Sequence, residues 1–187
     1  QHVADNSLAQ LDADAVPDRN VVGDFDDDGN LDAIVGLEKG TKILFYKNPG
    51  GLNSDPNKLW VRQEIYTIPG EGFSMDSGDI DHDGDDDIVL GEHRGTGNNR
   101  VIILENVNKA SSWNPHVIDS GATTLIDHHM GTELNDIDGD DDLDIISIGW
   151  TNQKVWLYEN TSEGEIVNTP TATVVPSHTP LVTSSPT

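Results

Sequence analysis

Short apolar runs, bounded by polar residues and by Gly, Asn or Pro, recur throughout residues 1–161. The runs are enriched in β-branched and aromatic residues, which together with their short length favours β-strands over helices. The pattern is clearest near the end of this region, where strands are expected at 113–119, 131–136, 144–150 and 154–160. The hydrophobic pattern therefore predicts an all-β chain of short strands joined by tight turns.

One longer pattern occurs three times, at a spacing of about 55 residues. It begins with an acidic stretch: GDFDDDGNLDAIVG at 23–36, GDIDHDGDDDIVLG at 78–91 and NDIDGDDDLDIISIG at 135–149. Further along each repeat come a basic residue, an apolar strand and a closing Asn: KILFYKN at 42–48, RVIILEN at 100–106 and KVWLYEN at 154–160. The chain is therefore built from repeats of about 1–56, 57–110 and 111–161.

Four short strands per repeat at this period are the layout of a propeller blade. We therefore expect an all-β fold of three four-stranded antiparallel propeller-like blades. A closed ring normally needs at least four blades, so three blades predict an incomplete or open propeller that other blades or chains complete. The first repeat has only QHVAD where the others have a Trp-containing strand, so the chain is expected to begin inside a repeat.

The acidic stretches have the spacing of a calcium loop. Carboxylates at alternate positions of a tight loop point inward, and position seven can add its backbone carbonyl, which gives the oxygen-rich shell that Ca²⁺ prefers. Glycine at position six allows the positive φ that folds the loop back on the ion. The candidate ligands are Asp24, Asp26, Asp28, Asn30 and Asp32; Asp79, Asp81, Asp83, Asp85 and Asp87; and Asp136, Asp138, Asp140, Asp142 and Asp144.

These loops differ from an EF-hand, which needs a bidentate Glu at position twelve between two helices. Position twelve is Val35, Leu90 or Ser147 here, inside a β-rich run. In the third loop Asp141 stands where glycine is expected, and Asp tolerates the left-handed conformation better than most residues. The sequence predicts about three Ca²⁺ ions, one per repeat, with weaker binding in the third loop.

Composition supports a cationic ligand. The chain has 34 acidic and 10 basic residues and a formal charge of -24, which argues against nucleic acid and anionic membranes as partners. It has no cysteine, no apolar run of the roughly 20 residues that a membrane span needs, and no signal-peptide layout at its start. Millimolar calcium outside the cell would supply the cross-links that disulfides cannot, so an extracellular location is expected.

The three acidic stretches resemble FG-GAP or VCBS-type repeats, the calcium-loop blades of integrin α-subunit propellers and of many secreted bacterial proteins. The resemblance covers roughly residues 1–161. It implies calcium in the hairpin loop between two strands of a blade. The chain differs from its usual seven-bladed relatives in having three repeats. The function implied is a secreted, non-catalytic calcium-binding module for adhesion or as a structural scaffold, with self-assembling fibre subunits as one form.

Two other functions remain open. The chain is alternatively a fragment of a larger propeller that binds glycans or proteins. A polysaccharide lyase is the third hypothesis, because a His with a nearby Arg can abstract a proton next to a uronate carboxylate. Neither candidate cluster recurs in the other repeats, which favours ordinary histidines at a blade rim over catalysis. The two clusters are His128, His129 and Glu133, and Glu92, His93 and Arg94.

Residues 162–187 are expected to form a tail or linker. Thirteen of the last nineteen residues are Thr, Ser or Pro and none is charged, a composition typical of linkers or O-glycosylated stalks. Its TATVVP stretch suggests that the tail of one copy docks on an open β edge of a neighbour, so other copies or further blades are the expected partners. The glycosylation candidates are Asn160, Thr169, Thr171, Thr173, Thr179 and Thr183.

Overall fold

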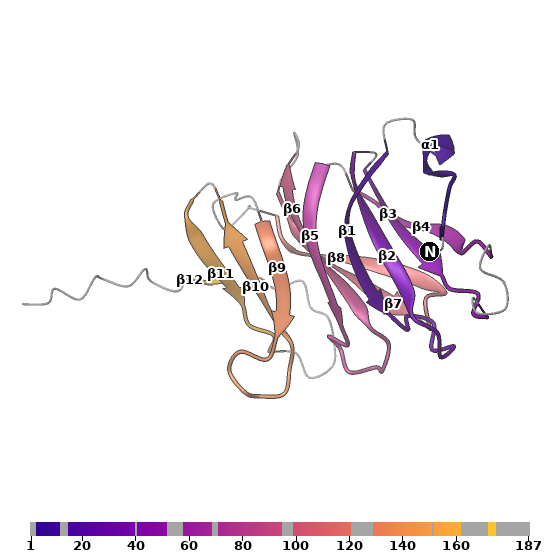
Figure 1. Ribbon diagram of the computed structural model, residues 1–187. Coiled ribbons are helices and arrows are strands. Elements are labelled where there is room, and N and C mark those ends of the chain that lie inside the picture. The colour runs from indigo at the N-terminus through magenta and orange to yellow at the C-terminus, as the bar shows by residue number, and fades with distance from the viewer. Residues whose placement is uncertain are drawn as a thin grey trace, which may run out of the picture.

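The computed structural model confirms an all-β fold with three antiparallel sheets (Figure 1). The one helix within the described ranges, α1 (Leu8–Leu11), has four residues, so no described helix is long enough to cross a membrane. The structure describes residues 3–11, 15–39, 41–51, 58–68, 71–94, 99–120, 129–150, 152–161 and 172–174.

Each sheet is a meander of four strands, in which every strand pairs with the next one along the chain. Sheet A contains β1 (Val16–Gly23), β2 (Asp32–Lys39), β3 (Lys42–Lys47) and β4 (Val61–Thr67). Sheet B contains β5 (Glu71–Gly78), β6 (Asp87–Arg94), β7 (Val101–Val107) and β8 (Ser112–Asp119). Sheet C contains β9 (His129–Asn135), β10 (Asp144–Gly149), β11 (Lys154–Tyr158) and β12 (Ala172–Val174).

The assignment of strands to sheets differs from the expectation at one strand. The segment expected at 113–119 is β8, and it pairs with β7 of sheet B instead of opening the third sheet. Consecutive antiparallel strands joined by a short connection pair most readily, and β8 follows β7 after a tight turn. Sheets A and B therefore each close with the strand that opens the next sequence repeat.

The fourth strand of sheet C comes from the Thr/Ser/Pro-rich segment. Residues 172–174 of the expected tail form β12, which pairs antiparallel with β11 of the same chain. The structure thus places this strand at the edge of sheet C of the same chain. The sequence had suggested that it docks on the edge of a neighbouring copy. Residues 162–171 and 175–187, with Thr169, Thr171, Thr179 and Thr183, lie outside the described residues.

The three sheets stack face to face, with sheet B in the middle (Figure 1). The strand alternation produces this arrangement, because successive side chains of a strand point to opposite faces. On β6, Ile88 and Leu90 pack toward sheet A and Val89 packs toward sheet C. Inner strands of adjacent sheets contact each other, β1 with β5 and β5 with β9, as expected for an open propeller-like arrangement.

Sheets B and C approach closely at Gly91. A Cβ atom at this position would lie 2.0 Å from Thr132 Oγ1 and 2.8 Å from Ser74 Oγ, so a larger residue fits only if these neighbouring groups shift. Ser74 Oγ donates to the carbonyl of His129 at 3.0 Å and accepts from the amide of Thr132 at 2.9 Å. These contacts fix the spacing of the two sheets.

The N-terminal segment covers part of the outer face of sheet A. Leu8 packs against the cluster of Leu37, Leu44 and Tyr46 on this face. Asp5 anchors the segment, because its carboxylate accepts hydrogen bonds from the hydroxyl of Tyr46 at 2.9 Å and from Arg62 at 2.7 Å. Hydrogen bonds to the ionised form outweigh the effect of burial and lower the pKa of Asp5 to about 2.

Candidate metal centres

Each acidic stretch forms the hairpin between the first and second strands of a sheet. The loops cover residues 24–31 between β1 and β2, 79–86 between β5 and β6, and 136–143 between β9 and β10. Together with the Asp that begins the following strand (Asp32, Asp87 or Asp144), they are referred to below as loops 1, 2 and 3. Neighbouring loops lie close to one another, since His82 Nδ1 of loop 2 is 3.7 Å from Asp142 Oδ1 of loop 3.

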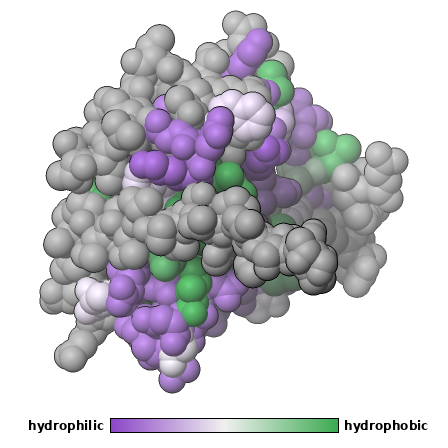
Figure 2. All heavy atoms as spheres, turned by 90° about the vertical axis from the view of Figure 1, so that its left-hand side faces the viewer, coloured by the Kyte–Doolittle hydropathy of each residue, from purple (hydrophilic) through white to green (hydrophobic). Residues whose placement is uncertain are grey.

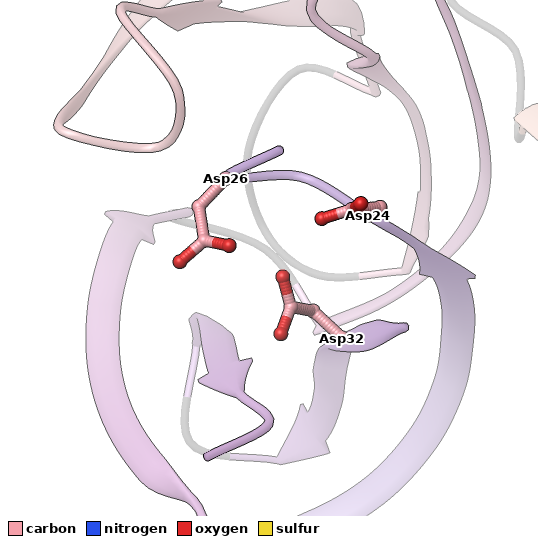
Figure 3. A group of neighbouring side chains, drawn as sticks. All are labelled: Asp24, Asp26 and Asp32. Carbon is pink, nitrogen blue, oxygen red and sulfur yellow. The ribbon is translucent and has the colours of Figure 1, made fainter. Parts of the chain in front are cut away.

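Three carboxylates converge in every loop. One oxygen of each lies within 4.8 Å of an oxygen from the other two members. Figure 3 shows the carboxylates of Asp24, Asp26 and Asp32 pointing toward one another. Three negative charges at this separation repel, so the arrangement favours a cation between them. The three groups are Asp24, Asp26 and Asp32; Asp79, Asp81 and Asp83; and Asp136, Asp138 and Asp144.

The first Asp of each loop folds the backbone around the cluster. Asp24 accepts hydrogen bonds from the amides of Asp28 at 3.0 Å and Gly29 at 2.9 Å, and Asp79 accepts one from Gly84 at 3.1 Å. Asp136 does the same in loop 3. These bonds orient the carboxylate and turn the following residues back over it.

Position six is left-handed in all three loops. Gly29 has φ +87° and Gly84 has φ +93°, and Asp141 has φ +74°. Asp141 therefore adopts the left-handed conformation that glycine adopts at this position in the other two loops. Position four is left-handed as well, and loop 3 has its glycine there, Gly139 with φ +85°.

The last Asp of each loop is buried and held by the third strand. Asp32, Asp87 and Asp144 are at most 1% exposed. Each accepts a hydrogen bond from the backbone amide of the closing Asn of its repeat, at 2.7, 2.7 and 2.8 Å. Burial, the largest cause, raises the pKa of Asp32 to about 6 and that of Asp87 to about 7. An unneutralised charge at these positions is thus unfavourable.

Several carboxylate oxygens in the clusters have no protein partner. Asp26 Oδ1, Asp32 Oδ2 and Asp79 Oδ1 are buried and have no hydrogen bond within the described residues. Buried polar atoms are almost always paired, and an unpaired one costs about 1–3 kcal/mol. A bound Ca²⁺ would satisfy these atoms, because it takes six to eight oxygen ligands from carboxylates and carbonyls. The donor set therefore fits calcium.

Other predicted ligands lie beside the clusters. Asp28 Oδ1 accepts from the backbone amide of Asn30 at 3.0 Å and from its side chain at 2.7 Å, which leaves the backbone carbonyl of Asn30 as its donor to an ion. The carboxylate of Asp85 accepts from the amide of Lys109, so it points away from loop 2. Asp140 accepts from the amide of Asp142 at 3.0 Å.

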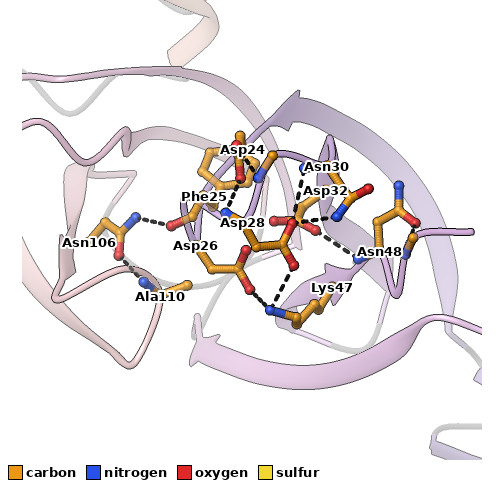
Figure 4. Close-up of polar contacts among 12 residues, drawn as sticks. Asp24, Phe25, Asp26, Asp28, Asn30, Asp32, Lys47, Asn48, Asn106 and Ala110 are labelled. Atoms are coloured by element: carbon orange, nitrogen blue, oxygen red, sulfur yellow. Dashed lines mark hydrogen bonds and ion pairs between the residues drawn. The ribbon is translucent and has the colours of Figure 1, made fainter.

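One residue beside loop 1, at the end of β3, was not expected from the sequence. Figure 4 shows the Lys47 ammonium at the edge of the cluster, in contact with Asp26 and 3.0 Å from Asp28 Oδ2. Hydrogen bonds to these carboxylates, first that to Asp26, raise the pKa of Lys47 above its ordinary value. The signal in the sequence was the residue before the closing Asn, which is Lys47 in the first repeat and Glu105 and Glu159 in the others.

The closing Asn residues connect loops to neighbouring sheets. Asn106 of sheet B donates its side-chain amide to the carbonyl of Phe25 in loop 1 at 2.9 Å (Figure 4). Asn160 of sheet C donates to the carbonyl of Ile80 in loop 2 at 3.3 Å. A glycan on Asn160, one of the predicted glycosylation sites, would have to replace this hydrogen bond.

The residues considered for catalysis are engaged elsewhere. Glu92 is 1% exposed and forms a bidentate pair with Arg100, with distances of 2.9 and 2.6 Å. His129 is 2% exposed, and its Nδ1 lies 3.0 Å from Ser147 Oγ. Neither of these two buried side chains is accessible to a polymer substrate. Glu133 is exposed, while His128 and the side chains of His93 and Arg94 lie outside the described part of the chain.

Residues 72–104 match the model of the FG-GAP repeat. This segment contains nearly all of β5, the whole of loop 2, β6 and the first half of β7. The chain carries an FG-GAP repeat. The match confirms the resemblance inferred from the acidic stretches, and it falls on the central one of the three. No curated protein and no solved structure matches the chain.

Proposed function

We propose that this chain is a secreted, non-catalytic module that binds three Ca²⁺ ions and serves as an extracellular scaffold or adhesion unit. The observation that carries the proposal is the set of unpaired, buried oxygens of Asp26 and Asp32, aimed into a group of converging carboxylates. Neither atom has a hydrogen-bond partner among the described residues. A divalent cation between the two carboxylates would satisfy both atoms.

The proposed ions contribute to folding. Each loop joins the first two strands of a sheet, so the unfolded chain has no preformed site. Ion binding is then linked to folding, and the free energy of binding adds to the free energy of unfolding. Such a module is rigid where calcium is millimolar, as outside the cell, and weakened where calcium is scarce. This dependence supports the proposed extracellular location.

The scaffold role requires partners, and the outer face of sheet C is suited to one. In sheet B, Val101 and Ile103 of β7 pack toward the next sheet. Val155 stands at the position of Val101 and points away from sheet B, with 46% of its surface exposed. Ile148, also on sheet C, is 54% exposed. Figure 2 views this side of the molecule, where hydrophobic side chains lie among hydrophilic ones.

We propose that this face packs against another blade, from a second copy or from further repeats. The two internal interfaces, A with B and B with C, are both made by such alternate apolar positions. An adhesion or scaffold assembly extends in this way by repeating one interface. When successive copies do not close a ring, repeating this interface produces a fibre.

Thermal unfolding of metal-stripped protein tests the calcium role. Millimolar CaCl₂ is expected to raise the melting temperature by more than about 5 °C over excess chelator, and MgCl₂ to raise it far less. Asp26→Asn is expected to reduce the calcium effect, whereas the control Asp18→Asn, at a carboxylate on β1 outside the loops, is expected to leave it unchanged. Equal melting temperatures in calcium and in chelator would exclude the proposal.

A further inference from the structure

Loop 1 differs from the other loops in the charge next to its cluster. Lys47 is the last residue of β3, and its ammonium contacts Asp26 and Asp28. The second repeat has Glu105 at the corresponding position. Burial first, and then the charges of nearby carboxylates that include Glu105, raise the pKa of Asp81 in loop 2. One cluster is thus adjacent to a positive charge and another to an additional negative charge.

The Lys47 contacts involve two predicted calcium ligands. Asp28 uses Oδ1 to accept hydrogen bonds from Asn30 and Oδ2 to pair with Lys47, so the ammonium occupies the carboxylate oxygen that Asn30 leaves unbonded. The equivalent residue in loop 2, Asp83, belongs to the converging group, while Asp28 does not belong to that of loop 1. An ion that takes Asp26 or Asp28 as a ligand therefore competes with the Lys47 ammonium.

The Lys47 side chain is free to leave. It is 41% exposed, whereas Asp26, its main partner, is 10% exposed. A lysine ammonium is strongly hydrated, so rotation into solvent replaces its carboxylate contacts with water. The carboxylates remain in the loop, where the unpaired oxygens of Asp26 and Asp32 stay directed at the centre of the cluster.

We propose that Lys47 is a built-in competitor for Ca²⁺ in loop 1, so that loop 1 fills at a higher calcium concentration than loop 2. This inference rests on the proposed calcium function. When calcium is low, the ammonium neutralises part of the cluster and keeps loop 1 folded without an ion. When calcium is high, the ion replaces it. Loop 1 thereby responds to changes in calcium concentration, while loop 2 stays occupied.

A site-resolved titration of the full chain tests this. The amides of Gly29 and Gly84 hydrogen-bond the first Asp of loops 1 and 2, so their ¹H–¹⁵N NMR signals report the two loops separately. Metal-stripped protein is titrated with CaCl₂ as wild type, as Lys47→Gln and as the control Lys42→Gln. Lys42 lies on the same strand and pairs with Glu64, outside the loop, so its variant has the same change of charge.

In the wild type, Gly29 is expected to reach half-saturation at about tenfold higher free calcium than Gly84. Lys47→Gln is expected to remove most of this difference, and Lys42→Gln to leave it. The inference is overturned if the two glycines titrate together in the wild type, or if Lys47→Gln shifts Gly29 no more than Lys42→Gln does. If neither glycine responds in any variant, the calcium function itself fails and this inference fails with it.

Discussion

The side-chain amide of Asn106 in sheet B donates a hydrogen bond of 2.9 Å to the backbone carbonyl of Phe25, the second residue of loop 1 in sheet A. The same relationship recurs one sheet further on, between Asn160 and Ile80. Loops 1 and 2 are thereby each attached to the neighbouring sheet as well as to their own strands. A loop that is held in place by an ion therefore also supports the contact between two sheets.

Replacing Asn106 by Ala is expected to lower the free energy of unfolding by about 2–3 kcal/mol. Asn106 is fully buried, and the substitution leaves the carbonyl of Phe25 and the amide of Ala110 without their partner. Asn48→Ala is the matched control, because the side chain of half-buried Asn48 binds backbone groups next to its own sheet, the carbonyl of Leu31 and the amide of Gly50. Urea unfolding in calcium measures both. Equal losses for the two variants would contradict a special role of the contact between sheets.

The pKa values of Asp32 and Asp87 predict opposite effects of pH with and without calcium. Folding raises them from 3.8 to about 6 and about 7, so protonation contributes stability that is full below pH 3.8 and lost as pH rises through about 7. In excess chelator the protein is therefore expected to melt several degrees higher at pH 5.5 than at pH 7.5.

Calcium reverses this dependence, because the ion binds the ionised carboxylates. The increase in melting temperature that calcium produces is expected to shrink from pH 7.5 to pH 5.5, as protons compete for Asp32 and Asp87. Differential scanning calorimetry at both pH values measures the two effects. In Asp87→Asn the slope in chelator is expected to become shallower. A chelated protein that gains stability as pH rises over this range would contradict the assignment.

Much of the fold could be predicted from the sequence because it depends on local patterns. Apolar runs of strand length identified strands such as β7 and β10, and the acidic stretches marked the hairpin that opens each sheet. The grouping of strands was not predicted correctly, because β8 carries the same residues whether it ends one sheet or begins the next. Only its pairing with β7 decides this. The strand at 172–174 was obscured by a Thr- and Pro-rich composition typical of linkers.

Loop 3 allows a test of backbone strain. Asp141 has φ +74°, a conformation that costs a non-glycine residue on the order of 1 kcal/mol. Asp141→Gly is therefore expected to stabilise the protein in calcium by about that amount. Asp142→Gly, one residue further on and without a positive φ, is expected to destabilise it, because glycine is favoured in the unfolded chain. Chemical unfolding compares the two variants, and a loss of stability in Asp141→Gly would show that φ is not the limiting feature.

The clustering of carboxylates could be predicted from the sequence, and the surroundings of the clusters could not. The alternate aspartates indicated a carboxylate cluster in each loop, and three of the predicted residues of each loop converge. The role of Lys47 depends on which strand end lies beside loop 1, and this follows from the pairing of β2 with β3. The burial of Asp32 likewise depends on the closing Asn of β3, which is distant in the sequence. Contacts between strands therefore determine both the position of Lys47 and the burial of Asp32.

The outer face of sheet C predicts a specific loss of association. Val155→Lys places a charge on the exposed face that is proposed to receive another blade, and it is expected to weaken self-association at least tenfold if copies join there. Val61→Lys is the control, because Val61 is a similarly exposed valine, at 62%, on β4 of sheet A. Sedimentation velocity over a range of concentrations measures both. Unchanged association in Val155→Lys would exclude this face.

The number of calcium ions bound per chain tests the central claim most directly. Metal-stripped protein is equilibrated with millimolar CaCl₂, and bound calcium is counted by native mass spectrometry, for the wild type and for a variant combining Asp24→Asn with Asp26→Asn. The account predicts three ions in the wild type and two in the variant, because loops 2 and 3 keep their converging carboxylates. A wild-type chain that binds no calcium, or a variant that binds as many ions as the wild type, would contradict it.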